Sequence, residues 1–151
     1  MKTYLKKIIS GMIAASIMTA AIFSASANLT TDGNYNGTHY YGELQINESN
    51  SNTYAKGTTS RSGGNGFTGV SVYSTGRMSE GSDRRYTDYK ESSAGGSYAE
   101  VYLRSSDVDG GIGEFWGTVG QHYITSKSES SSYTTHGNPY YIEELFDYYK
   151  L

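Results

Sequence analysis

The chain has no cysteine among its 151 residues. Its fold therefore contains no disulfide, and no thiolate is available to bind a metal. Small domains that work in oxidising surroundings are often held together by disulfides. This one must depend on packing and hydrogen bonds, or on a metal or a partner. The same absence excludes a lipid anchor of the kind that is attached to an N-terminal cysteine.

Basic residues are scarce and unevenly placed. The chain has 12 lysines and arginines against 15 aspartates and glutamates, and three of the basic residues are Lys2, Lys6 and Lys7. From residue 28 onward nine basic residues stand against 15 acidic ones, a net charge of −6. We do not expect a chain this acidic to bind nucleic acid or anionic membranes by charge.

Long apolar runs are absent except near the N-terminus. The three lysines precede an uncharged, mainly apolar run of 16 residues (8–23), and the small residues Ala25-Ser26-Ala27 follow it. This order is typical of a cleavable signal peptide. The run is shorter than the roughly 20 residues that a membrane-spanning helix needs. We therefore expect residues 1–27 to be removed and the remainder to be secreted, as a bacterial exoprotein without a transmembrane segment.

Aliphatic side chains are few beyond residue 27, where five leucines, four isoleucines and five valines stand against 15 tyrosines. A tyrosine ring buries a large apolar area, but its hydroxyl needs a partner. Disordered chains are poor in aromatic residues. The composition therefore predicts a folded domain whose core is built partly from tyrosine and whose surface carries further tyrosines.

Alternation of apolar and polar residues predicts short β-strands over much of the chain. The segments are 39–46, 53–61, 67–75, 84–91, 97–104 and 112–125. The glycines in the last segment predict bulges, and Asp109-Gly110 before it predicts a hairpin turn. Residues 126–137 are either a polar linker or a weak strand. Residues 28–38 are rich in turn formers and are expected to be a flexible N-terminal lead.

The C-terminal segment changes to a helical period. Asn138 is a good N-cap and Pro139 suits the first helical position. A stripe of apolar residues then recurs at helical spacing: Ile142, Leu145, Phe146 and Tyr149. The pattern predicts a short amphipathic helix at about 139–150 that docks on the sheet. Residues 39–151 together are thus predicted to be one mainly β domain, a small antiparallel β-sandwich or barrel with a C-terminal helix.

Exposed tyrosines are the best candidates for a binding site. Tyr98 and Tyr102 lie opposite the apolar face of their segment, as Tyr41 does in its own, and Trp116 is added to this set. Aromatic rings on a flat sheet face can stack on sugars or pack on a partner. The alternative is that the C-terminal helix covers these rings and that they belong to the core.

Metal-binding and catalytic patterns are weaker. Asp107, Asp109 and Glu114 are possible calcium ligands, but the spacing does not match an EF-hand loop. The three histidines, His39, His122 and His136, are far apart in the sequence, and the nucleophile elbow of serine hydrolases is absent. We therefore predict no metal, no cofactor and no catalytic residue.

Three glutamates leave one enzymatic alternative open. Glu43, Glu100 and Glu114 lie on predicted strands, and two of them facing a tyrosine-lined cleft would suit cleavage of glycosidic bonds. The other interpretation is that they are solvated charges on the outer face of the sheet.

Three short segments resemble a known family. They are Val70-Ser-Val-Tyr-Ser-Thr-Gly-Arg77, Ala94-Gly-Gly-Ser-Tyr-Ala99 and Glu114-Phe-Trp116. They are similar to segments of the small, cysteine-free β-sandwich bacteriocins of the lactococcin 972 type. The resemblance implies a secreted sandwich that acts on neighbouring cells, and no site residues are carried over from it.

The function that the sequence favours is a non-catalytic extracellular binding or surface-associated module that uses its tyrosine-rich strands. Carbohydrate, a cell surface or a protein is the expected partner, and the oligomeric state stays open. The alternatives are a bacteriocin or toxin-like exoprotein and a small carbohydrate-active enzyme.

Overall fold

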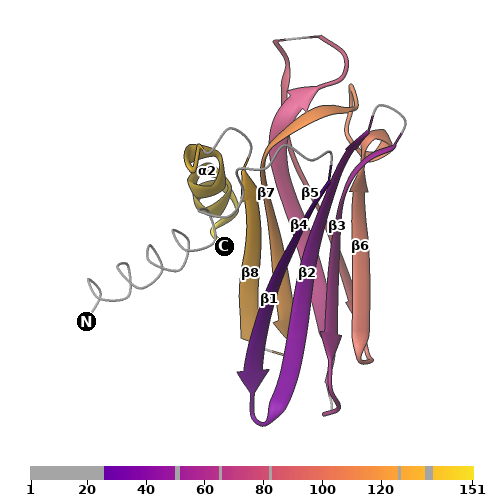
Figure 1. Ribbon diagram of the computed structural model, residues 1–151, viewed down its shortest axis with the longest axis vertical. Coiled ribbons are helices and arrows are strands. Elements are labelled where there is room, and N and C mark those ends of the chain that lie inside the picture. The colour runs from indigo at the N-terminus through magenta and orange to yellow at the C-terminus, as the bar shows by residue number, and fades with distance from the viewer. Residues whose placement is uncertain (1–25, 50–51, 65, 82, 126, 135–137) are drawn as a thin grey trace, which may run out of the picture.

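Eight strands, a 3₁₀ turn and one helix make up the described part of the chain (Figure 1). The computed structural model describes residues 26–49, 52–64, 66–81, 83–125, 127–134 and 138–151. The strands are β1 (Ser26–Tyr35), β2 (Thr38–Ser49), β3 (Asn52–Arg61), β4 (Thr68–Met78), β5 (Arg85–Ala94), β6 (Tyr98–Arg104), β7 (Ile112–Ile124) and β8 (Lys127–Thr134). The 3₁₀ turn η1 spans Ser105–Asp107, and the helix α2 spans Tyr140–Tyr149.

The strands form two antiparallel sheets of four strands each. The first sheet has the order β1-β2-β3-β6, and the second has the order β5-β4-β7-β8. The sheets lie face to face (Figure 1), with β1 next to β8 at one side and β5 next to β6 at the other. The prediction of a small antiparallel β-sandwich with a short C-terminal helix is confirmed.

The core lies between the inner faces of the two sheets. Leu44 and Ile46 of β2, Leu103 of β6 and Phe115 of β7 are fully or almost fully buried there. Alternation places these side chains inward, because successive residues of a strand point to opposite faces. Each fully buried side chain of this size contributes about 1.5–3 kcal/mol through the apolar area that it removes from water.

The prediction of a flexible lead at residues 28–38 is wrong for this structure. β1 pairs with β2 over its whole length, from Ser26 opposite Asn47 to Tyr35 opposite Thr38. The turn between them is Asn36-Gly37, and both residues have positive φ (49° and 78°). An Asn-Gly pair in this conformation is a favoured two-residue hairpin turn. The turn formers that suggested a loose segment therefore build a hairpin.

The prediction of a signal peptide falls mostly outside the described residues, because it covers residues 1–27. Ser26 and Ala27, at the end of the predicted peptide, belong to β1. Within the described residues, no helix is both long and apolar enough to cross a membrane.

The Asp109-Gly110 turn does not form the predicted hairpin. β6 pairs with β3, whereas β7 pairs with β4 and β8, so the chain crosses from one sheet to the other between them. Gly110 and Gly111 both have positive φ (82° and 68°) and reverse the chain. A turn signal fixes that reversal, but it does not fix which sheet the next strand joins.

Two features left uncertain by the sequence are resolved. β7 has register shifts against β4 that leave Trp116 and Gly113 without a Cα partner there, so the bulges expected in this segment are present. Residues 127–134 form β8, paired with β7, rather than a linker.

The helix α2 packs on the outer face of the second sheet (Figure 1). Ile142 and Leu145 are buried against Tyr73 of β4 and Val119 of β7. The N-cap residue is Pro139, one position later than the sequence suggested. The side-chain oxygen of Asn138 still accepts a hydrogen bond from the backbone N–H of Tyr140 at 3.1 Å. The apolar stripe read from the sequence is therefore the docking face of the helix.

Candidate functional site

The outer face of the first sheet carries most of the predicted binding residues. Its outward side chains on β2, β3 and β6 include a group that we call the tyrosine face: Tyr41, Glu43, Gln45, Tyr54, Lys56, Thr58, Tyr98, Glu100, Tyr102 and Arg104. Because α2 packs on the other sheet, it does not cover this face. Tyr41 and Tyr98 are 41% and 51% exposed. These rings are therefore surface groups rather than core.

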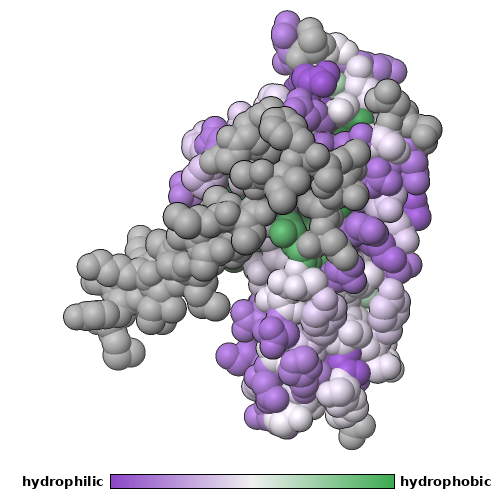
Figure 2. Space-filling model, viewed as in Figure 1, coloured by the Kyte–Doolittle hydropathy of each residue, from purple (hydrophilic) through white to green (hydrophobic). Residues whose placement is uncertain are grey.

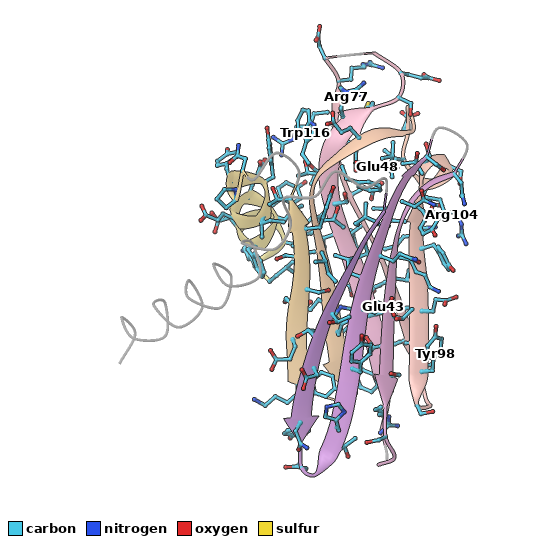
Figure 3. All side chains as sticks on the ribbon, in the orientation of Figure 1. Glu43, Glu48, Arg77, Tyr98, Arg104 and Trp116 are labelled. Atoms are coloured by element: carbon cyan, nitrogen blue, oxygen red, sulfur yellow. The ribbon has the colours of Figure 1, made fainter. Side chains whose placement is uncertain are left out.

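The register sets the order of side chains across the face. Gln45 of β2 and Tyr102 of β6 are both opposite Lys56 of β3, and Glu43 and Glu100 are both opposite Thr58. Figure 3 shows Glu43 near the middle of the face, with Tyr98 and Arg104 along β6. Where Figure 2 colours the surface seen from this side, it is mostly hydrophilic or of intermediate hydropathy. Charged groups and rings thus alternate across a nearly flat surface.

Tyr102 is held by groups on three sides. The ring of Tyr54 meets it edge-on, with 5.6 Å between centroids. The guanidinium carbon of Arg104 lies 4.3 Å from the Tyr102 centroid, and the Lys56 ammonium lies 5.1 Å from it. Cations are attracted to the negative face of an aromatic ring. These contacts fix the orientation of the ring before any ligand arrives.

Glu100 is the centre of a hydrogen-bonded group next to this ring. It accepts hydrogen bonds from the Lys56 ammonium and from the Tyr98 hydroxyl, both at 2.8 Å. The hydrogen bonds from Lys56 and then Tyr98 lower the pKa of the Glu100 carboxyl, and the same contacts raise the pKa of Lys56 and of Tyr98. Glu100 therefore stays an anion and orients the exposed Tyr98 ring.

A shallow hollow lies between β2 and β3 beside this group. Its lining residues are Glu43, Gln45, Lys56 and Thr58. A carboxylate, an amide, an ammonium and a hydroxyl together offer both donors and acceptors of hydrogen bonds. Tyrosine rings and hydrogen-bonding groups thus stand side by side on the face.

Trp116 does not belong to the tyrosine face. It lies on β7 of the second sheet, where its ring is 5.2 Å from the ring of Tyr141 on α2. Its indole N–H donates to Glu114 at 3.2 Å, and the Arg85 guanidinium lies 5.9 Å from its ring. The structure therefore brings Tyr41, Tyr98 and Tyr102 to one sheet and places the fourth predicted ligand residue on the other.

Two of the three weak candidates for calcium ligands, Asp107 and Glu114, engage other protein groups. Asp107 binds the Lys90 ammonium at 2.6 Å and accepts from the Arg104 backbone N–H at 2.7 Å. Burial works against its ionisation, but these two contacts outweigh burial and lower the pKa of Asp107. Glu114 lies 3.5 Å from Arg77. No group of three or more His, Asp or Glu side chains suited to a metal occurs among the described residues.

The histidines are also separate. His122 is completely buried, between the hydroxyl of Thr59 at 3.0 Å and that of Ser131 at 2.8 Å. His39 is exposed and lies 3.4 Å from Asp32. His136 lies outside the described residues. His122 is thus a core residue with both ring nitrogens paired.

Several residues of the tyrosine face were missed at the sequence level. Tyr54, Lys56 and Arg104 lie on predicted strands, but nothing in a single strand shows that they meet Tyr102. Alternation placed Arg104 on an outward face, whereas 53–61 was predicted only as a polar strand without assigned faces. The pairing of β3 with β6 could not be predicted from either segment.

Comparison of the chain with protein-family models, with curated proteins and with solved structures gives no match.

Proposed function

We propose that the protein is a non-catalytic binding module and that its tyrosine face binds carbohydrate. The observation that carries the proposal is the outer face of the first sheet, which no other described element covers and where oriented tyrosine rings adjoin a polar hollow. The apolar face of a sugar ring can stack on Tyr98 or Tyr41, while its hydroxyls find donors and acceptors in Glu43, Gln45 and Lys56. The contacts of Tyr102 and Glu100 supply the rigidity that lowers the entropic cost of binding.

Polysaccharide binding by single variants tests this function. We expect the purified protein to bind insoluble polysaccharide or isolated cell-wall material, and Tyr98→Ala to weaken that binding about fivefold or more, as truncation of a contact residue does. Tyr148→Ala is the matched control, because Tyr148 is 70% exposed but lies on α2. Equal loss in both variants, or no binding to any such material, would refute the proposal.

The proposed place of action is outside the cell. The support is the pattern of residues 1–27, in which three lysines, an apolar run and a small-residue site follow in order. N-terminal sequencing of protein recovered from the culture medium should begin at Asn28. Retention of the whole chain inside the cells would contradict secretion.

A bacteriocin-like exoprotein is the second candidate. Two of the segments that carry the resemblance, 70–77 and 114–116, lie side by side in β4 and β7, where Arg77 is opposite Glu114. Growth inhibition of related strains by the purified protein distinguishes this candidate from a sugar-binding module. Inhibition that persists in Tyr98→Ala would favour the bacteriocin.

The arrangement of glutamates favours binding over glycosidic cleavage. Glu43 and Glu100 share a face but lie two strands apart, about 10 Å between Cα atoms at the usual strand spacing. Glu114 lies on the other sheet. A general acid needs a raised pKa, and the pKa of Glu100 is lowered by Lys56 and Tyr98.

A further inference from the structure

Four tyrosines form a second aromatic cluster on the opposite sheet. Tyr73 of β4 and Tyr89 of β5 stack, with 5.6 Å between centroids and 13° between ring planes. Tyr149 of α2 lies 4.7 Å from Tyr73 and 5.4 Å from Tyr89. Tyr148 meets Tyr149 edge-on at 4.9 Å. We call these four rings the Tyr89 cluster.

The cluster has a buried base and an accessible rim. Tyr73 is only 9% exposed and packs under the helix, whereas Tyr89 and Tyr148 are 46% and 70% exposed. The base fixes the position of the rim, because Tyr89 stacks on Tyr73 and Tyr149 closes over both. Parts of the Tyr89 and Tyr148 rings are thus accessible to solvent on a packed support that joins a strand to the helix.

Its charge environment differs from that of the other aromatic groups. The cations of Lys56 and Arg104 lie over the Tyr102 ring, and the Arg85 guanidinium lies over the rings of both Trp116 and Tyr141. No lysine or arginine of the described residues lies over a ring of the Tyr89 cluster.

Two carboxylates, Asp88 and Glu91, act on tyrosines of the cluster. Burial first, and then the negative charge of Asp88, raise the pKa of Tyr149 to about 12. Burial and, among its charged neighbours, Glu91 raise the pKa of Tyr73. The cluster therefore combines partly exposed rings, over which no lysine or arginine of the described residues lies, with two nearby carboxylates.

We propose that the Tyr89 cluster is a binding site for a small organic cation that carries a quaternary ammonium group, such as choline. Such a group has no N–H to donate, so it is recognised by aromatic faces and by nearby negative charge. A free cation fits better than a zwitterion such as phosphocholine, because Asp88 and Glu91 repel the phosphate. This site lies on the sheet opposite the tyrosine face and is independent of carbohydrate binding.

An NMR titration of the purified protein with choline tests the site. We expect the ring signals of Tyr89 and Tyr149 to shift in a saturable way. The neutral carbon isostere of choline, in which carbon replaces the quaternary nitrogen, should cause little shift, and phosphocholine should bind more weakly than choline. Equal binding of choline and its isostere would show a merely apolar patch and overturn the proposal, as would the absence of any saturable shift.

Variants locate the site. Tyr89→Leu should weaken choline binding about two- to fivefold, the range of a partly exposed cation–π contact, and Asp88→Asn should also weaken it. Tyr98→Leu is the matched control, because Tyr98 is similarly exposed on the other sheet. If Tyr89→Leu disturbs the fold, Tyr148→Leu replaces it, because Tyr148 is more exposed, and it should likewise weaken choline binding. Affinity unchanged in the cluster variants, or reduced equally in Tyr98→Leu, would overturn the assignment.

Discussion

His122 places an ionisable ring in the centre of the sandwich. It lies across from Gly42 of β2, whose missing Cβ leaves room for the ring: a Cβ at Gly42 would overlap the imidazole. Burial lowers the pKa of His122 to about 4, from an ordinary value of 6.5. The ring is therefore neutral in the folded protein at pH values where it would be protonated in the unfolded chain.

This difference predicts a loss of stability in mild acid. Between pH 6.5 and about 4 the unfolded state binds one proton more than the folded state at His122, so the free energy of unfolding falls as the pH falls. The full effect is on the order of 3 kcal/mol and is complete at about pH 4. Urea unfolding at a series of pH values measures it.

Two variants isolate the contribution of His122. His122→Gln should be less stable than the natural chain at pH 7, but it should lose less stability on acidification between pH 6.5 and 4. His39→Gln, which changes an exposed histidine outside the core, is the control variant. A slope that His122→Gln leaves unaltered would mean that other groups cause the loss.

Glu48 of β2 is an inward-facing carboxylate at one end of the core and is labelled in Figure 3. Its Oε1 accepts a hydrogen bond from the Phe115 backbone N–H at 2.7 Å, next to the β7 bulge. Glu48→Ala should lower the free energy of unfolding by about 1.5–3 kcal/mol, because a hydrogen bond to a charged group is lost. Glu48→Gln keeps an acceptor and should cost less.

Chemical denaturation compares these variants with Glu43→Ala. Glu43 is on the same strand but faces outward, so its change should stay within about 0.5 kcal/mol. An equally small effect of Glu48→Ala would show that the bulge N–H finds another partner.

Single residues also show where sequence-based inference succeeded and where it failed. Alternation in 39–46 and 97–104 placed Tyr41, Tyr98 and Tyr102 on an outer face, because the period of a strand is local. The same reasoning grouped Trp116 with them, which is wrong. Whether two outer faces belong to one sheet depends on which strands pair, and that is not a local property.

At the scale of elements, α2 depends on its docking face. Leu145 is completely buried against the second sheet. Leu145→Ala should lower the free energy of unfolding by about 2–5 kcal/mol, because it removes buried methyl groups and leaves a cavity. Thermal unfolding followed by circular dichroism measures the loss. Tyr148→Ala, on the exposed side of the helix, is the control, and a comparable loss there would contradict this account of docking.

The helix was predictable as an element, and β1 was not. Asn138, Pro139 and the apolar stripe are all local signals, and together they predicted a helix. Among residues 29–35 of β1 the only aliphatic side chain is Leu29, and the pattern is mainly polar. The strand is held by pairing with β2 and by Gly33, where a Cβ would come within 2.5 Å of the Tyr40 ring. The contacts that stabilise β1 therefore come from the neighbouring strand β2 and are not visible in the sequence of β1 itself.

At the scale of the whole molecule, the sandwich is assembled from distant parts of the chain. β3 pairs with β6 and β4 pairs with β7. In each pair the two strands are separated in the sequence by at least one strand of the other sheet. Folding that depends on such long-range pairs is slow, and we expect a time constant between about a millisecond and seconds. Stopped-flow refolding followed by Trp116 fluorescence measures it. Complete folding within microseconds would contradict a rate limited by topology.

The edges of the two sheets have a consequence for how the protein behaves when it is concentrated. An unpaired strand edge can recruit a strand from another molecule, and charged side chains there oppose this. β1 lies beside β8 and β5 beside β6, so each edge has a neighbour in the other sheet. β8 is built mainly from serine with Lys127 and Glu129, and β5 alternates acidic and basic residues. A chain rich in tyrosine and free of disulfides is thereby protected against edge-to-edge aggregation.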